Sequence, residues 1–266
     1  MNKHFSLLLI LVFFASCSPY QKALKSEDVA VKYPMAEKLY EEKKYTKAIR
    51  LFEQIAPSYR GKPQAEKMFY MYAQSYYKSK QYYLAGYQFE SFVSAYPKSE
   101  KVEEAAYLSA FCYSKLSPRY SLDQVDTYKA LEKMQRFIDT YPNSEYLEAA
   151  NVTVKMLREK LEEKAFEIAK QYNTIRDYKA ALVVLDNFVS EHPGTPFKED
   201  AYFYKLDSAY KLATNSIEEK KRERFQIAKE AHDKLIRDFP ETKYKSKVDQ
   251  MKKEIDNELI ENQNTK

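Results

Sequence analysis

The chain has 266 residues, of which 31% are charged and 15% are aromatic, and a net charge of +5. Its three glycines, Gly61, Gly86 and Gly194, leave no Gly-rich phosphate-binding loop. They also argue against a hairpin-rich β fold, whose turns need residues with φ > 0. Basic and acidic residues are interleaved, which favours a solvated helical surface over a nucleic-acid-binding one. The composition therefore predicts an all-α protein without a nucleic-acid partner.

Residues 1–16 have the form of a secretory signal peptide. Lys3 precedes an apolar run from Phe5 to Ala15, which is too short to span a bilayer comfortably. Two small residues then precede Cys17. This arrangement resembles the lipobox of bacterial lipoproteins, in which the signal is removed and the cysteine becomes the lipid-modified N-terminus.

The residues around Cys17 also bear on location. Phe14 stands where a lipobox usually has leucine, which is a departure from the pattern. Ser18 follows the cysteine, and by the lipoprotein sorting rule a residue other than Asp favours delivery to the outer membrane. We expect a lipidated tether over 17–27 and a protein anchored at the periplasmic face of the cell outer membrane.

A repeat organises the rest of the chain. Four prolines follow an aromatic residue or histidine at intervals of 45 to 51 residues, and each has an alanine twelve positions before it. The prolines are Pro97, Pro142, Pro193 and Pro240, and the alanines are Ala85, Ala130, Ala181 and Ala228.

The two cysteines, Cys17 and Cys112, form no C-x-x-C motif, so a disulfide framework is excluded.

The repeated unit resembles the tetratricopeptide (TPR) consensus. The second unit matches it most fully, with Phe69, Tyr72, Ala73 and Tyr76 in a first helix and Ala85, Phe89, Phe92 and Pro97 in a second. We expect the small Ala73 and Ala85 to face each other where these helices cross. The first unit has Arg60 where the consensus has proline.

The units predict an all-α, elongated right-handed superhelix of about five TPR-like helix pairs. Residues 28–142 would hold units 1 to 3, and residues 143–262 would hold units 4 and 5 with a C-terminal capping helix. We also expect an inserted loop at 117–124 and a long helix from about 145 to 172. A coiled coil is the alternative for so Lys/Glu-rich a chain, but the prolines and the alanine register argue against it.

The sequence contains no recognisable catalytic or metal-binding motif. His192 and His232 occupy repeat positions, which favours structural roles, and adjacent carboxylates on a helix point about 100° apart. We therefore expect no catalytic residues, no metal, no cofactor and no enzymatic activity.

A peptide-binding groove is predicted on the first helices of the first three units. At the consensus positions that line the concave face of TPR arrays, the chain has Tyr33, Tyr40, Lys67, Tyr70, Gln74, Tyr77, Tyr107 and Phe111. Rigid aromatic rings with a few polar anchors suit the capture of an extended peptide. The alternative is that these rings fill the packing between repeats.

The lipobox and about five TPR-like units with recurring Y-P-x-S-E segments resemble the BamD family of outer-membrane β-barrel assembly lipoproteins. The resemblance covers essentially the whole chain after Cys17. It implies a scaffold whose N-terminal units receive targeting segments of unfolded outer-membrane proteins and whose C-terminal units bind the POTRA domains of the barrel protein BamA. The basic run of Lys220, Lys221, Arg222 and Arg224 is a candidate for the second contact, or a solvated loop.

Two other classes of protein share parts of this pattern. Periplasmic TPR proteins linked to Tol-Pal and cell-wall synthesis usually carry a coiled coil and no lipobox. Glycan-binding lipoproteins resembling SusD are much longer and use Trp to stack on sugars, whereas this chain has no Trp.

Overall fold

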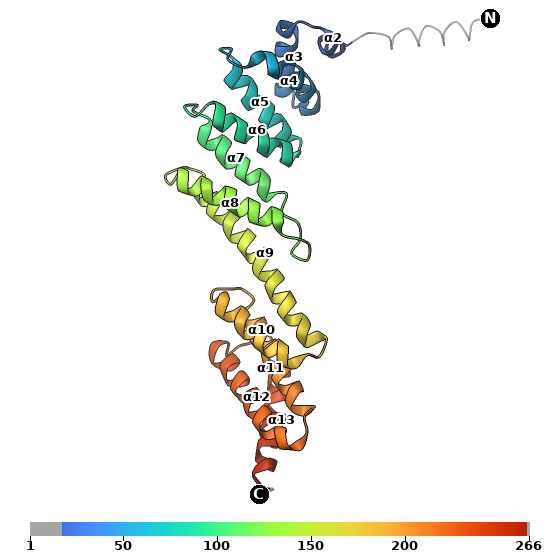
Figure 1. Cartoon of the computed structure of the whole chain (residues 1–266), viewed down its shortest axis with the longest axis vertical. Helices are drawn as coiled ribbons and strands as arrows, with labels where there is room; N and C mark the ends of the chain where they lie inside the picture. The colour runs from blue at the N-terminus through green and yellow to red at the C-terminus, as the bar shows by residue number, and fades with distance from the viewer. Residues whose placement is uncertain (1–17, 265–266) are drawn as a thin grey trace, which may run out of the picture. The chain divides into compact units, whose positions relative to one another are not determined.

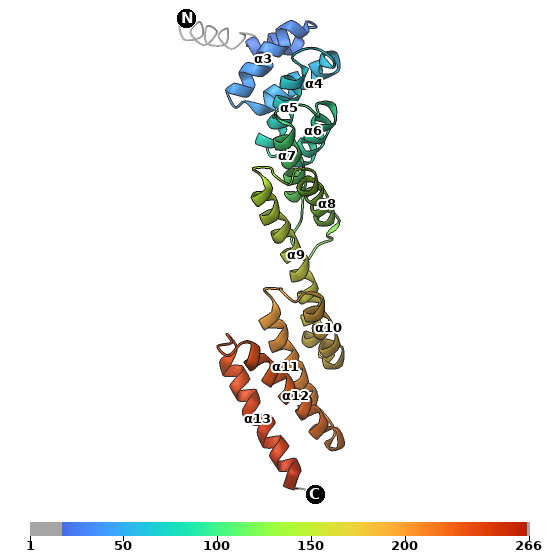
Figure 2. The same cartoon turned by 90° about the vertical axis from the view of Figure 1, so that its left-hand side faces the viewer.

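The structure is a computed structural model that describes residues 18–264. Within this range it contains twelve helices and no strand, which confirms the all-α class (Figure 1, Figure 2). The helices are α2 (Pro19–Lys25), α3 (Val29–Glu41), α4 (Tyr45–Tyr59), α5 (Ala65–Lys78), α6 (Tyr82–Ala95), α7 (Val102–Ser114), α8 (Val125–Thr140), α9 (Leu147–Thr174), α10 (Tyr178–Glu191), α11 (Lys198–Thr214), α12 (Glu218–Asp238) and α13 (Lys245–Asn264).

The described helices form five pairs, α3/α4, α5/α6, α7/α8, α9/α10 and α11/α12, followed by α13 in the capping position. The long helix expected from about 145 to 172 is α9, and the loop expected at 117–124 separates α7 from α8. These elements agree with the five TPR-like pairs and the terminal helix that the repeat register predicts.

The chain divides into two compact units. One comprises the described residues up to Pro118 together with Gln124–Val154, and the other comprises Arg119–Asp123 with the described residues from Lys155 onward. The division lies within α9 rather than between residues 142 and 143. The first turns of α9 belong with α8 because Ala150 and Val154 share a buried cluster with Met134 and Phe137.

Ten alanines are buried inside the helix pairs. In every pair, one alanine from each helix is no more than 2% exposed: Ala36 and Ala48, Ala73 and Ala85, Ala110 and Ala130, Ala169 and Ala181, Ala209 and Ala228. A methyl side chain lets two helices approach closely, and the larger residues of the same helices then fill the space on either side. The alanines that recur in the sequence repeat are therefore the residues that each helix pair buries between its two helices.

The turns inside three of the pairs use left-handed residues other than glycine. Lys43, Lys80 and Arg176 have φ between 59° and 67°, and each lies five residues before the alanine of its second helix. Around Lys80, its N–H donates to the carbonyl of Tyr77 and the next N–H donates to the carbonyl of Tyr76. This Schellman-type arrangement satisfies the last carbonyls of α5. The scarcity of glycine therefore did not prevent φ > 0 turns.

Each of the four repeat prolines ends the second helix of its pair by restricting the backbone of the residue before it. Tyr96, Tyr141, His192 and Phe239 are the last hydrogen-bonded residues of their helices, with φ between −126° and −137°. The ring of a following proline disfavours helical backbone at this position, so the helix stops there.

The serine or threonine two residues after the proline bonds both within its own turn and to an earlier helix. Ser99 Oγ accepts the N–H of Lys101 in a local turn, whereas α7 begins only at Val102. The same hydroxyl donates to Glu66 on α5 at 2.6 Å. Thr242 repeats this arrangement, donating to Glu199 on α11 at 2.7 Å. The Pro-x-Ser/Thr segment thus ties the turn back to an earlier helix.

The segment expected to be a tether is largely folded. Residues 19–25 form α2, which begins with a proline and is capped by Ser18 accepting the N–H of Gln21. Tyr20 and Ala23 are buried in the same cluster as residues of α3 and α4. Apolar burial holds this helix against the first pair. Cys17 lies outside the described residues.

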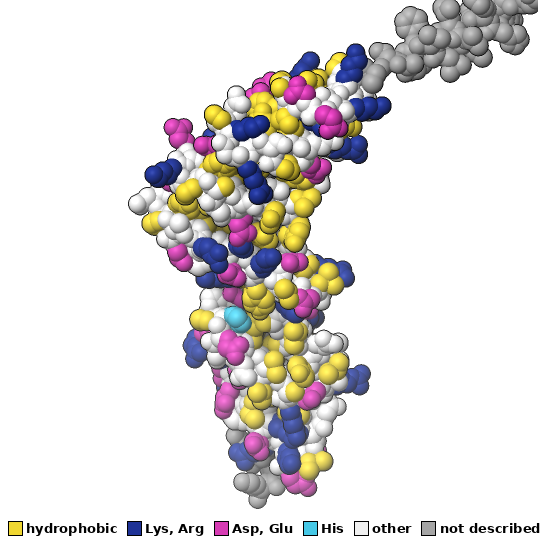
Figure 3. Space-filling model, turned by 45° about the horizontal axis from the view of Figure 1, so that its top comes forward, with side chains coloured by type: hydrophobic (Ala, Val, Ile, Leu, Met, Phe, Trp, Pro, Cys, Tyr) yellow, Lys and Arg dark blue, Asp and Glu magenta, His cyan; other side chains and the backbone are white. Residues whose placement is uncertain are grey.

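Two findings concern how residues 18–264 relate to membranes and to charged partners. None of its helices combines the length and the apolar character that crossing a bilayer requires. On the face shown in Figure 3, basic and acidic side chains are interleaved rather than gathered by sign.

Gly86 marks a tight contact between α6 and α7. A Cβ at this position would lie 3.2 Å from Tyr113 Cε2 and 3.3 Å from Cys112 Cβ. Ser109 also donates a hydrogen bond to the carbonyl of Gly86 at 2.9 Å. The absence of a side chain at Gly86 therefore lets the second and third pairs pack together.

We expect Gly86→Val to lower the free energy of unfolding by about 1–3 kcal/mol, because added methyl groups overpack this contact. Urea denaturation followed by circular dichroism measures the change. Gly194→Val is the control, since a Cβ there meets no atom within 4 Å. Equal effects of the two substitutions would contradict the close packing of α6 on α7.

Candidate functional site

The predicted groove residues lie on α3, α5 and α7, the first helices of the first three pairs. A helical turn of 3.6 residues brings Tyr70, Gln74 and Tyr77 to one side of α5. Glu37 of α3 forms an ion pair with Lys67 of α5 at 2.5 Å. The three helices therefore contribute to one continuous surface within the first compact unit.

Aromatic rings connect α5, α6, α7 and the residue just before α9. Tyr77 lies 6.5 Å from Phe111, centroid to centroid, and Phe111 stacks on Tyr107 at 5.7 Å. Tyr107 stacks in turn on Tyr146 at 4.9 Å. Tyr70 joins through Phe89, which contacts both Tyr70 and Tyr77. We call the side chains of Tyr40, Tyr70, Tyr77, Tyr107, Phe111 and Tyr146 the aromatic face.

A polar network lies beside these rings. Gln74 Nε2 donates to the hydroxyl of Tyr70 at 2.8 Å and lies 3.5 Å from Glu104 Oε1. Lys101 forms an ion pair with Glu104 at 3.2 Å, and its ammonium lies 5.8 Å from the centre of the Tyr70 ring. The network thus holds Tyr70 and Glu104 in fixed positions at the join between α5 and α7.

Burial keeps the phenols of the aromatic face neutral. It raises the pKa of Tyr40, Tyr77 and Tyr107 above the ordinary value. The pKa of Tyr70 is raised strongly, first by burial and then by its hydrogen bond with Glu104. The hydroxyls therefore act as neutral hydrogen-bonding groups at physiological pH.

Two of the predicted groove residues are buried and do not present a surface. Tyr33 is 9% exposed because its ring stacks on Tyr59 of α4 at 5.1 Å. Gln74 is 6% exposed, and its Oε1 accepts no hydrogen bond from the described residues. Lys67 is exposed, and the other five predicted residues are half-buried. Tyr40 packs edge-on against Tyr45 at 5.8 Å, centroid to centroid.

Sequence reasoning missed Tyr146, which extends the aromatic face beyond the third pair. It follows Pro142 in a segment that the repeat pattern assigned to a helix start. Its position two residues after Ser144, whose hydroxyl accepts its N–H, is the only local signal of an ordered ring there.

The structure does not bring the basic run of α12 together. Lys221 pairs with Glu218 at 2.6 Å, and Arg224 donates to Ser216. Arg222 instead lines a cavity of about 770 Å³ between α12 and α13, and Lys220 is exposed. The four cations point in different directions around the first two turns of the helix.

The remaining nucleophilic and titratable candidates lie in the packing. Burial raises the pKa of the Cys112 thiol to about 12, so the thiol is not ionised at neutral pH. His232 is buried, with Nδ1 2.9 Å from Asp233, and His192 packs on Phe188. Within residues 18–264, no cluster of three His, Cys, Asp or Glu side chains has the arrangement of a metal site.

Comparison with known proteins gives one family match. The family model described as YfiO, outer membrane lipoprotein, matches residues 25–182 and 172–263. Among curated proteins there is no significant match. The solved structures that are similar include two of TPR-like repeats of a kinesin light chain from Podosopora anserina. Both are 15% identical with a TM-score of 0.33, and the alignments cover 82% and 79% of this chain and 98% of each of those.

The raised tyrosine pKa values predict alkaline destabilisation. Tyr70 and Tyr76 hold their protons more tightly in the folded state than in the unfolded chain, where the pKa is about 10. Their contribution is therefore complete below pH 10 and decreases as pH rises above it. We expect the free energy of unfolding to fall between pH 8 and pH 11.

Urea titrations at the two pH values measure this loss. Tyr70→Phe should lose less stability over the interval than Tyr128→Phe, since Tyr128 is 62% exposed. The same pH dependence in both variants would show that Tyr70 is not a source of the effect.

Proposed function

The chain belongs to the YfiO family of outer membrane lipoproteins, the BamD family, and from this membership we propose that it is a periplasm-facing scaffold of the outer-membrane β-barrel assembly complex. In this role it would bind targeting segments of unfolded outer-membrane proteins through the first compact unit. The second unit would bind the POTRA domains of a BamA-like barrel protein. The scaffold would be anchored to the outer membrane by lipid on Cys17, and it would perform no catalysis.

The continuous aromatic face is the observation that carries the peptide-binding part of this proposal. Strands of outer-membrane barrels alternate apolar and polar residues and carry aromatic side chains near their ends. Half-buried rings such as Tyr77, Tyr107 and Phe111 offer apolar contact area with little loss of side-chain entropy. The Glu37–Lys67 and Glu104–Lys101 pairs provide polar contacts of both signs beside the rings.

Gln74 supports the recognition of an extended backbone. Its Oε1 is buried without a donor among the described residues, and an unsatisfied buried acceptor costs about 1–3 kcal/mol. In the proposed complex, a backbone N–H of the peptide donates to this oxygen. The bound peptide would then satisfy an acceptor that the free protein leaves unpaired.

The second unit offers a different surface for a folded partner. Arg222 lines the cavity between α12 and α13 beside Glu219 and Glu223, together with the apolar side chains of Leu259 and the exposed Ile260. Charged groups of both signs around an apolar centre are common in protein interfaces. We therefore assign docking to Arg222 within the basic run, with Lys220, Lys221 and Arg224 in supporting positions.

The aromatic face is tested by peptide binding. We expect Tyr70→Ala combined with Phe111→Ala to weaken binding of a fluorescent peptide corresponding to the last strand of an outer-membrane barrel by at least tenfold. The reason is that the substitutions remove two ring contacts. Fluorescence anisotropy measures the affinity, and circular dichroism verifies that the helices remain folded.

Tyr128→Ala is the matched control, because this tyrosine is exposed on α8 and belongs to no ring contact with the aromatic face. If the double variant binds the peptide as tightly as the control does, the aromatic face is not the binding surface.

The anchor is tested separately. Cys17→Ala should release the protein from outer-membrane fractions into the soluble periplasmic fraction, because acyl chains contribute about 0.8 kcal/mol per buried CH₂. Immunoblotting of separated membranes measures the distribution. Cys112→Ala, at the other cysteine, should leave the protein in the membrane. Unchanged membrane recovery of the Cys17 variant would rule out lipid anchoring through this residue.

A further inference from the structure

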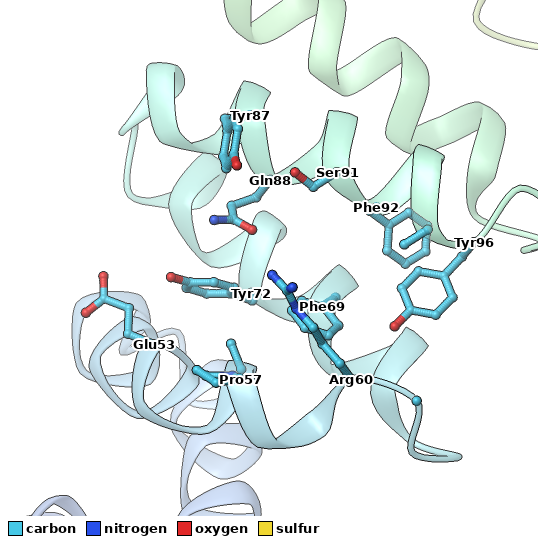
Figure 4. A pocket seen from close by; sticks show the side chains of 13 residues that line it. Glu53, Pro57, Arg60, Phe69, Tyr72, Tyr87, Gln88, Ser91, Phe92 and Tyr96 are labelled. Carbon is cyan, nitrogen blue, oxygen red and sulfur yellow. The ribbon is translucent and has the colours of Figure 1, made fainter.

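A second candidate site lies on the other side of α5. It is a cavity of about 800 Å³ between α4, α5 and α6, closed at one end by the turn that contains Arg60 and Gly61. Phe69 and Tyr72 line it from α5 (Figure 4). Successive helical residues point about 100° apart, so these two rings point away from Tyr70 and Tyr77. None of the residues of the aromatic face lines this cavity.

The apolar walls of the cavity are held in place by ring packing. Tyr96 lies 6.3 Å from Phe69 and 5.2 Å from Phe92, centroid to centroid. Phe92 is buried, whereas Tyr87 at the rim is 59% exposed. The walls are therefore already formed in the free protein. The exposed ring of Tyr87 is left at the opening, where it can cover a bound group.

Three polar side chains converge on the cavity without partners. Arg60, Gln88 and Ser91 all line it, and Figure 4 shows the Arg60 guanidinium reaching between the rings toward Gln88. None of the three forms a side-chain hydrogen bond or ion pair with the described residues. The acid of the cavity, Glu53, already accepts a hydrogen bond from Tyr76 at 2.6 Å.

Arg60 is thus the one basic side chain lining the cavity, and it has no ion-pair partner among the described residues, whereas Glu53 is bonded to Tyr76. Arg60 stands where the other units have their proline, at the end of α4, so the position that elsewhere only ends a helix here carries a guanidinium. A planar guanidinium beside aromatic walls matches a carboxylate that accompanies an apolar ring.

We propose that this cavity binds a segment of a partner protein in which an aromatic side chain lies next to an Asp or Glu. The aromatic ring packs on the half-buried rings of Phe69 and Tyr96 where they line the cavity. The carboxylate accepts hydrogen bonds from Arg60, and Gln88 and Ser91 bond to the backbone of the segment. The cavity shares no lining residue with the aromatic face, and Phe92 is its one ring that contacts Tyr70.

Three fluorescein-labelled peptides test the chemistry on the full lipidated chain in detergent: Ser-Gly-Phe-Glu-Phe-Gly-Ser, the same peptide with Lys for Glu, and the same peptide with Ala for both Phe. The first should bind, and each of the other two should bind at least tenfold more weakly. Arg60→Glu should weaken the first peptide at least tenfold and strengthen the Lys peptide.

Arg50→Glu is the matched control, since Arg50 is an exposed arginine of the same helix and does not line the cavity. Ser91→Trp, which fills the cavity from an exposed position, should also abolish binding of the first peptide. The proposal is overturned if Arg60→Glu and Arg50→Glu bind the first peptide equally, if the three peptides bind alike, or if none binds at millimolar concentration. One further outcome would overturn the proposal. If inorganic phosphate displaces the first peptide in an Arg60-dependent way and the Ala peptide binds as tightly as the first, the cavity is a site for anions alone.

Discussion

Each helix pair buries two alanines, and the rest of the structure is arranged around this constraint. A pair of methyl groups at each crossing sets how near the two helices lie, and the flanking Phe, Leu and Tyr side chains fill the volume that remains. Ala73 and Ala85 are fully buried, as are their counterparts in the other pairs. Because large residues cannot enter the crossings, the rings of each first helix are displaced to its two sides. This displacement creates both the aromatic face and the walls of the cavity.

The two sides of α5 illustrate how one helix serves both surfaces. Tyr70 and Tyr77 point to the side shared with α7, where Glu104 and Lys101 fix their surroundings. Phe69 and Tyr72 point to the side shared with α4 and α6. Both surfaces consist of rings held by other rings, so each is formed before any ligand arrives. A preformed surface loses less entropy on binding, which is the physical advantage of a helical scaffold for capturing flexible chains.

The repeat register predicted most of the fold, because it records local requirements. Alanine at a crossing, a proline after the last helical residue and the length of α9 are each determined by residues close in sequence. The surface was predicted less well, because exposure depends on neighbours far along the chain. Tyr33 occupies a groove position of the consensus, but Tyr59 covers it, and nothing near Tyr33 in sequence indicates this. Similarly, Arg60 was visible as a departure from the proline pattern, but the cavity it enters is formed by α6, more than twenty residues later. The α2 helix was missed because its seven residues have only two buried side chains.

The central claim is that this chain is a scaffold that joins a barrel-assembly protein to its substrates. The most direct measurement is affinity purification of the full lipidated chain from detergent-solubilised outer membranes, with the associated proteins identified by mass spectrometry. The account predicts recovery, in near-equal amounts, of a barrel protein that carries POTRA domains. Recovery of Tol-Pal components or of glycan transporters in its place would contradict it.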